Sequence, residues 1–117
     1  MKVHVKVSLA DQQDEEFCGP GILQLLDGVR RTGSIHQAAG EMKLSYVKAL
    51  KILNRLETSL GQPVLIRQKG GAERGRSTLT PFARRFMRDF TALRKEIQRN
   101  AQRASKPFIK QYSEPTP

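Results

Sequence analysis

Apolar residues recur at helical spacing in four stretches of the chain. The first stretch begins at Pro20, which suits the first turn of a helix, and stops before Gly33, which suits a left-handed helix end. Gly28 lies inside this stretch and costs about 1 kcal/mol relative to alanine. The pattern therefore predicts a helix over residues 20–32 that depends on tertiary packing. Its apolar side is formed by Ile22, Leu23, Leu25, Leu26 and Val29.

The second stretch is short and begins with a capping signal. Ser34 and Gln37 have the spacing of a capping box, in which the serine hydroxyl accepts a hydrogen bond from the amide three residues later. The predicted helix runs to about Met42. Lys43 and Leu44 then form a tight turn, so another helix is expected to follow at once.

The third stretch begins with Ser45 as its cap and ends at Leu60, before Gly61. Its apolar positions are four, three and four residues apart and form one buried stripe. Together with the second stretch it predicts a helix-turn-helix. The stripe consists of Ala49, Leu53, Leu56 and Leu60.

Period-two alternation and turn residues predict the strands. Residues 3–9 alternate apolar and polar side chains, which indicates a half-buried strand, and an acidic loop follows at residues 11–16. Residues 64–67 and 77–79 predict a hairpin around a glycine-containing basic loop. A hairpin directly after the third helix is typical of a wing.

The fourth stretch predicts a long final helix. Thr80 is suited to its cap and Pro81 to its first position. Apolar residues recur every three or four positions, and the helix is expected to reach about residue 103, or roughly 35 Å. We therefore predict a domain over residues 1–104 and a poorly ordered tail over residues 105–117, which contains three prolines. The apolar stripe is Phe82, Phe86, Phe90, Leu93 and Ile97.

These elements define one fold class: mainly α with a small β-sheet. The expected architecture is a winged helix-turn-helix with a long C-terminal dimerisation helix. The predicted order is strand, three helices, two strands and a final helix. A chain of 117 residues is long enough for one such domain.

The charge is concentrated in one part of the chain. The formal net charge is +10, and residues 67–103 alone carry eleven basic and three acidic side chains. This asymmetry predicts a polyanionic partner, and with the fold it favours double-stranded DNA.

Other function classes have little support in the sequence. The single cysteine, Cys18, excludes an intramolecular disulfide and is consistent with a cytoplasmic protein. No apolar run approaches the length of a membrane span, so no membrane association is expected. His4 and His36 are far apart, and no metal-ligand spacing or phosphate loop is present. We therefore expect no enzyme activity, no metal and no cofactor.

Several short motifs occur in the order and spacing of a known family. Residues 33–86, GSIHQAAGEMKLSYVKALKILNRLETSLGQPVLIRQKGGAERGRSTLTPFARRF, resemble the N-terminal domain of the molybdate-responsive regulator (ModE) family. That domain is itself similar to the winged helix of LysR-type regulators. The resemblance extends over about residues 3–103. It implies a winged helix-turn-helix that binds DNA.

The chain departs from the family pattern at a few positions. Val47 occupies a position that is usually basic, Leu50 stands where tryptophan is common, and Ala83 stands where glycine is typical. Complete members carry a C-terminal oxyanion-binding region of small β-barrels, which this chain is too short to contain. We therefore expect no molybdate binding by this chain.

Candidate site residues follow from the predicted elements. Tyr46, Val47, Leu50 and Lys51 are expected to face the major groove, where methyl groups meet thymine and lysine donates to guanine. Serines at helix starts and basic residues on the wing would contact phosphates. The predicted DNA-binding residues are Ser34, Ser45, Tyr46, Val47, Lys48, Leu50, Lys51, Arg55, Lys69, Arg74 and Arg76. The predicted dimerisation residues are Phe86, Phe90, Leu93 and Ile97.

The function that the sequence favours is a sequence-specific, homodimeric, DNA-binding transcriptional regulator. One alternative is a winged helix that docks on another protein. A second is an architectural protein that binds DNA without sequence preference. The sequence does not specify the operator or any effector.

Overall fold

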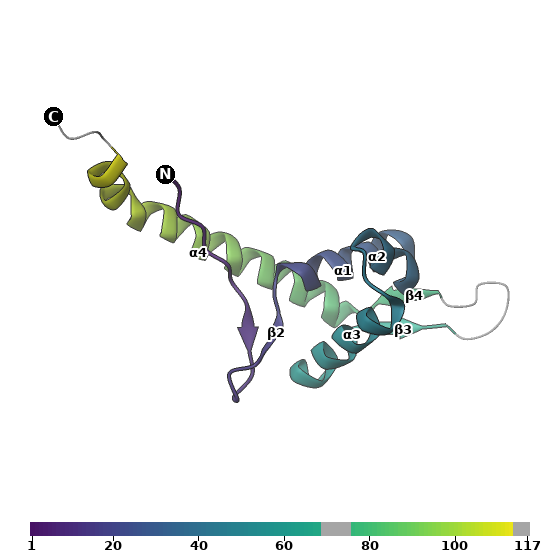
Figure 1. Ribbon diagram of the computed structural model, residues 1–117. Helices are drawn as coiled ribbons and strands as arrows, with labels where there is room; N and C mark the ends of the chain where they lie inside the picture. The colour runs from purple at the N-terminus through teal and green to yellow at the C-terminus, as the bar shows by residue number, and fades with distance from the viewer. Residues whose placement is uncertain (69–75, 114–117) are drawn as a thin grey trace.

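The computed structural model describes residues 1–68 and 76–113. The helices are α1 (Pro20–Thr32), α2 (Ile35–Glu41), α3 (Tyr46–Leu60) and α4 (Pro81–Ser113). The strands are β1 (Leu9–Ala10), β2 (Glu16–Cys18), β3 (Leu65–Arg67) and β4 (Ser77–Leu79). The first three helices gather at one end of the molecule beside the β3–β4 hairpin, and α4 projects away from them (Figure 1). The mainly α winged helix-turn-helix that the sequence predicted is confirmed.

The helix boundaries follow the capping residues that the sequence identified. The Ser34 hydroxyl accepts from the Gln37 amide, and the Ser45 hydroxyl accepts from the Lys48 amide, both at 3.1 Å. Gly33 and Gly61 end α1 and α3 with φ angles of 73° and 69°. These left-handed conformations favour glycine, so both predicted helix ends are confirmed.

The core lies where α1, α2 and α3 meet the first residues of α4. Its most deeply buried side chains include Leu25, Leu26, Val29, Leu53 and Leu56. Helices α1 and α2 approach each other closely at Gly28, where an added Cβ atom would lie 2.8 Å from the Ala38 Cβ atom. Glycine in the middle of α1 therefore permits the short distance between α1 and α2.

The N-terminal region differs from the predicted strand. Only Leu9–Ala10 is a strand, and it pairs antiparallel with β2, which the sequence did not predict. The acidic segment between them is the hairpin turn, because the Asp11 carboxylate accepts from the amides of Gln13 and Glu15 at 2.9 and 3.0 Å. A side chain that caps its own turn in this way stabilises a short hairpin without a long ladder.

Residues 1–8 run beside α4 and pair with no strand of the described chain (Figure 1). The carbonyl of Val3 accepts a hydrogen bond of 3.0 Å from the side-chain amide of Gln102. Val3, Val5 and Val7 are half-buried and the residues between them are mostly exposed. The alternation therefore reflects packing on a helix, and the prediction of a strand over residues 3–8 was wrong.

The final helix is longer than predicted. It continues through Ser105 to Ser113 and contains Pro107, so a tail over residues 105–113 was also wrong. Proline removes one backbone donor from the helix. The rings of Phe108 and Tyr112, one turn apart, pack with their centroids 4.9 Å from each other and support the last turns. Residues 114–117 lie outside the described chain.

The β3–β4 hairpin is tied to the ends of α3 and α4. Its strands pair in register, with Leu65 opposite Leu79. The Glu57 carboxylate on α3 accepts from the amides of Val64 and Leu65 at 2.8 and 3.3 Å. The amide of Thr80, the residue before α4, donates to the carbonyl of Val64 at 3.0 Å. Both ends of the hairpin base are therefore fixed, which holds the wing beside α3.

Across residues 1–68 and 76–113, no helix is both long and apolar enough to cross a membrane. In the same residues, no three His, Cys, Asp or Glu side chains gather in a way that could hold a metal ion.

Candidate nucleic-acid interface

Helix α3 has one fully buried side and one exposed side. Ala49, Leu53 and Leu56 are completely buried against the core. Val47 is 61% exposed, and Lys48 and Lys51 are exposed as well. The first half of α3 thus presents an apolar methyl group and two cations to solvent. This combination fits the edges and phosphates of a DNA major groove.

Two other residues that were predicted to face the major groove are half-buried. Leu50 is half-buried and packs against the core. Tyr46 is also half-buried, and its ring stacks on His36 of α2 with the centroids 4.1 Å apart and the planes 9° apart. This stack joins the two helices across the turn. It restricts the directions in which the Tyr46 hydroxyl can point, and it gives His36 a role that the sequence did not suggest.

The starts of α2 and α3 carry the predicted serines. Each hydroxyl satisfies one backbone amide in the first turn, and Ser45 is exposed while Ser34 is half-buried. The remaining first-turn amides have no partner within their helices. Backbone amides at a helix start, with the positive end of its dipole, suit a phosphate oxygen.

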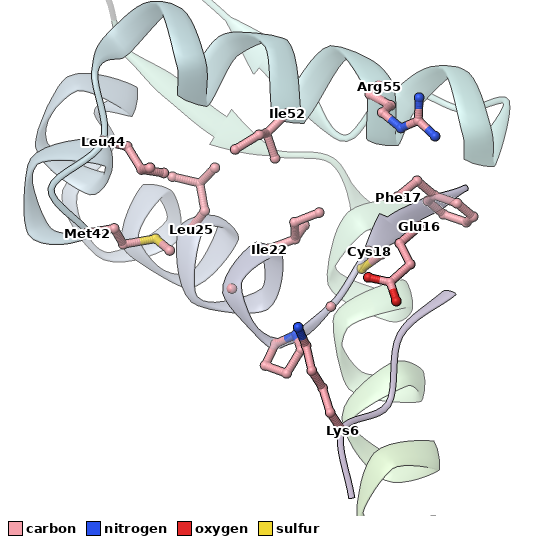
Figure 2. A pocket seen from close by; sticks show the side chains of 13 residues that line it. Lys6, Glu16, Phe17, Cys18, Ile22, Leu25, Met42, Leu44, Ile52 and Arg55 are labelled. Atoms are coloured by element: carbon pink, nitrogen blue, oxygen red, sulfur yellow. The ribbon is translucent and has the colours of Figure 1, made fainter. Parts of the chain in front are cut away.

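Arg55 has intramolecular partners that the sequence did not foresee. Its Nη2 atom lies 3.4 Å from a carboxylate oxygen of Asp11 and 3.2 Å from one of Glu15. In Figure 2, Arg55 lies on the side of α3 that faces Phe17 of β2. Exposed pairs of this kind contribute about 0–1 kcal/mol each. Arg55 is therefore placed to hold the hairpin on α3, and less of its charge is available to DNA.

The base of the wing lies next to the start of α2. The amide of Ser77 donates to the carbonyl of Gly33 at 2.8 Å, and Arg76 forms an isolated bridge with Ser34. Two of the predicted DNA contacts are therefore neighbours through the backbone. The other two wing residues on that list, Lys69 and Arg74, lie outside the described residues.

The predicted dimerisation residues do not share one environment. Phe90 is only 3% exposed in the single chain, whereas Leu93 is 46% exposed. Phe86 and Ile97 are half-buried. Phe90 therefore packs on its own chain, and its assignment to a surface for a second copy is corrected. Phe90 belongs to the buried core cluster, against which Leu9 of the N-terminal segment packs.

Cys18 lies in the core near α4. Its side chain is 2% exposed, and burial raises the pKa of its thiol from 9.0 to about 11, although the charge of Arg94 opposes the shift. Such a thiol is a packing residue at neutral pH, because the reactive thiolate is almost absent.

Comparison with known proteins agrees with the geometry. The family model for the bacterial regulatory helix-turn-helix protein, lysR family, matches residues 21–84. The molybdenum transport protein ModE of Azotobacter vinelandii is 32% identical over 83 residues, which are 71% of this chain and 31% of that protein. The transcriptional regulator ModE of Haemophilus influenzae is 33% identical over 81 residues, or 69% of this chain and 32% of that protein. The chain thus spans about a third of the length of these relatives.

Solved structures show the same fold. The crystal structure of a CbnR_DBD–DNA complex has a TM-score of 0.56 and 24% identity, covering 73% of this chain and 92% of that one. The crystal structure of CbnR, a LysR family transcriptional regulator, has a TM-score of 0.53 and 24% identity, covering 70% of this chain and 27% of that one. Because the family model covers more than half of the chain, including all of α2 and α3, this chain belongs to the LysR family of bacterial regulatory helix-turn-helix proteins.

Proposed function

We propose that this chain binds double-stranded DNA in a sequence-specific way, as the DNA-binding part of a transcriptional regulator. The observation that carries the proposal is the exposed first half of α3, where Val47, Lys48 and Lys51 face solvent beside a serine-capped helix start. Membership of a family of regulators supports it. The similar fold of the CbnR_DBD–DNA complex supports the same mode of binding.

Some of these side chains would contact base edges, and others would contact phosphates and position the protein on the duplex. Val47 and Lys51 are the leading candidates for base contacts, because both are exposed and one helical turn apart. The amides at the starts of α2 and α3 would hold phosphates on either side of the groove, with Lys48 adding charge. Tyr46 would act mainly through its stack on His36, which fixes the turn.

We further propose that two copies associate through α4. Leu93, Phe108 and Tyr112 are 46%, 57% and 61% exposed, and Phe82 and Phe86 line a cavity of about 380 Å³ together with Leu93. These residues form an apolar side along nearly the whole helix. Exposed apolar area of this extent on a projecting helix favours a partner.

The spacing of these residues suits an antiparallel pair. Ile97 is the central residue of α4 (Pro81–Ser113). A twofold axis beside it places Phe108 of one copy opposite Phe86 of the other, and Tyr112 opposite Phe82. Such an isologous contact buries both ends of the stripe equally. It would also set the distance between two α3 helices, as a palindromic operator requires.

Selection of bound duplexes from a random DNA pool tests the function. We expect enrichment of one sequence with twofold symmetry. Equal retention of all sequences, with affinity only at low salt, would instead indicate an architectural protein. Absence of binding at any salt concentration would indicate a module that docks on another protein.

The proposed activity is binding and requires no bond to be made or broken. It would take place in the cytoplasm, where bacterial DNA lies. The names of the two relatives refer to molybdenum transport and to transcription, and this chain matches only a third of each. The DNA sequence enriched by selection would therefore be used to identify the genes that it controls.

A further inference from the structure

A small polar cavity lies between the end of α1, the base of the wing and the first turn of α4. Its volume is about 120 Å³, room for roughly four waters or one phosphate group. Four arginines line it, and none of the described residues in its lining is a carboxylate. They come from three different elements, so no sequence pattern groups them. The arginines are Arg30, Arg31, Arg76 and Arg84.

The charge in this arginine pocket is only partly neutralised. Asp27 and Glu41, just outside the lining, bind Arg31 through three hydrogen bonds of 2.6–3.3 Å. These bonds lower the pKa of Glu41, and together with those from Arg30 they lower the pKa of Asp27. Both acids are therefore ionised at neutral pH. Two carboxylates face at least three guanidinium groups, which leaves the pocket cationic.

The Arg30 side chain is oriented by Asp27 and keeps one nitrogen available for a ligand. Its Nε and Nη2 atoms donate to one oxygen of Asp27 at 3.0 and 2.8 Å, and Nη1 makes no hydrogen bond within the described chain. The pair with Asp27 fixes the guanidinium on the last turns of α1. A guanidinium that is oriented before binding loses less entropy when it takes up a phosphate.

Arg84 is the second available cation. It is exposed on the first turns of α4, and across residues 1–68 and 76–113 it forms no ion pair or side-chain hydrogen bond. Thr80 caps α4 through a 3.0 Å bond to the amide of Ala83, which fixes the turn that carries Arg84. Its position on a rigid helix start brings its charge to the pocket.

The pocket adjoins two of the proposed DNA contacts. Gly33 forms part of its wall and directly precedes Ser34, the cap of α2. Ser77 forms another part, and the bond from its amide to Gly33 closes the wall between wing and helix. A duplex that lies along the start of α2 and the wing therefore passes the mouth of the pocket.

We propose that the arginine pocket binds one phosphate of the DNA backbone, with Arg30 and Arg84 as its donors. This inference rests on the proposed function and adds a contact outside both α3 and the wing. The contact would position the duplex without reading its sequence. Bidentate arginine suits a phosphate because its planar fork matches two oxygens.

Fluorescence anisotropy titrations over a series of KCl concentrations test the proposal. The probes are the duplex enriched by selection and a random duplex of equal length. We expect the Arg84→Gln variant, and the variant with both Arg30→Gln and Arg84→Gln, to lower the salt slope by about 0.9, the share of one phosphate. The loss should be equal on both duplexes. Arg84→Lys should retain most of the slope.

The control is Arg99→Gln, which removes one positive charge about 22 Å further along α4 and also releases Glu96 from its 2.7 Å pair with Arg99. If Arg84→Gln and Arg99→Gln give the same slope, the pocket proposal is wrong while the proposed function stands. If the wild type binds neither duplex, both proposals fall. Circular dichroism should show equal helix content for all variants, which these exposed positions permit.

A neutral methylphosphonate, moved one phosphate at a time along the duplex, locates the contact. At one position it should weaken the wild type but leave the double variant unchanged. Calorimetry with inorganic phosphate distinguishes a free anion as the source. Stoichiometric binding that Arg84→Gln abolishes, without any change in the DNA salt slope, would overturn the assignment to DNA.

Discussion

The packing of α1 on α2 gives the sharpest test of the fold. Gly28 is buried in α1, and a Cβ atom at this position would lie 2.8 Å from the Cβ and 3.2 Å from the Cα atom of Ala38. Both atoms belong to a short side chain or to backbone, so neither can rotate away. Relief requires α1 and α2 to move apart.

The magnitude follows from two opposing effects. Alanine in place of glycine in a helix gains about 1 kcal/mol from backbone propensity. Overpacking of a close helix contact costs about 1–3 kcal/mol. We therefore expect Gly28→Ala to be destabilising by about 1 kcal/mol, and by up to about 2 kcal/mol if α2 cannot shift. Gly40→Ala is the matched control on α2, because no atom beyond its chain neighbours and its own helix backbone lies within 4 Å of its Cβ position. It should be stabilising by up to about 1 kcal/mol.

Urea unfolding followed by circular dichroism, at one protein concentration, measures both variants. A second readout is Ala38→Gly in the Gly28→Ala background, which removes the clashing methyl group. Ala38→Gly by itself costs about 1 kcal/mol of helix propensity, so the readout is the coupling between the two sites, which should be favourable and exceed about 0.5 kcal/mol. If Gly28→Ala is as stable as Gly40→Ala, the argument from close helix contact is refuted.

Three further predictions concern the interface, the dimer and the core. Lys51→Ala should narrow the difference in affinity between the selected and a random duplex by about 1–3 kcal/mol, and an equal loss on both would assign Lys51 to phosphate contact. Replacement of both Leu93 and Ile97 by Glu should give a monomer in analytical ultracentrifugation, whereas a wild type that is monomeric at tens of micromolar would refute the α4 pair. The raised pKa of Cys18 means that the folded state holds this proton more tightly than the unfolded state. Its contribution to stability is therefore complete below about pH 9 and is lost as the pH rises toward about 11. The stability of the wild type relative to Cys18→Ala should fall over that range and stay constant below it.

Local sequence signals predicted the helix-turn-helix in detail. The caps at Ser34 and Ser45 and the stops at Gly33 and Gly61 all lie where the pattern placed them. These features depend on hydrogen bonds and φ angles within a few residues, so the sequence is sufficient to specify them. The buried stripe of α3 was equally clear, because helical periodicity is also a local property.

Signals that depend on distant residues were not visible in the sequence. The alternation at residues 3–8 indicated a strand, but a strand needs a partner and this segment packs on α4 instead. The prolines after residue 104 indicated a tail, but one missing backbone donor at Pro107 does not stop the helix. Phe90 was assigned to a dimer surface, but it is buried in the core of its own chain.

The same distinction applies to the charged residues. The sequence identified a basic protein, because net charge is a count of residues. It also placed Lys48 and Lys51 on the exposed side of the third helix, because the periodicity of that helix alone determines which side is buried. It could not show that Arg55 would meet Asp11 and Glu15, which lie 40 or more residues earlier in the chain. Nor could it bring Arg30 and Arg84 to one pocket, because they lie on α1 and α4, which are separated in the chain by α2, α3 and the wing. Local hydrogen bonding and periodicity determined the elements, and the packing of distant segments decided which charges remain available to a partner.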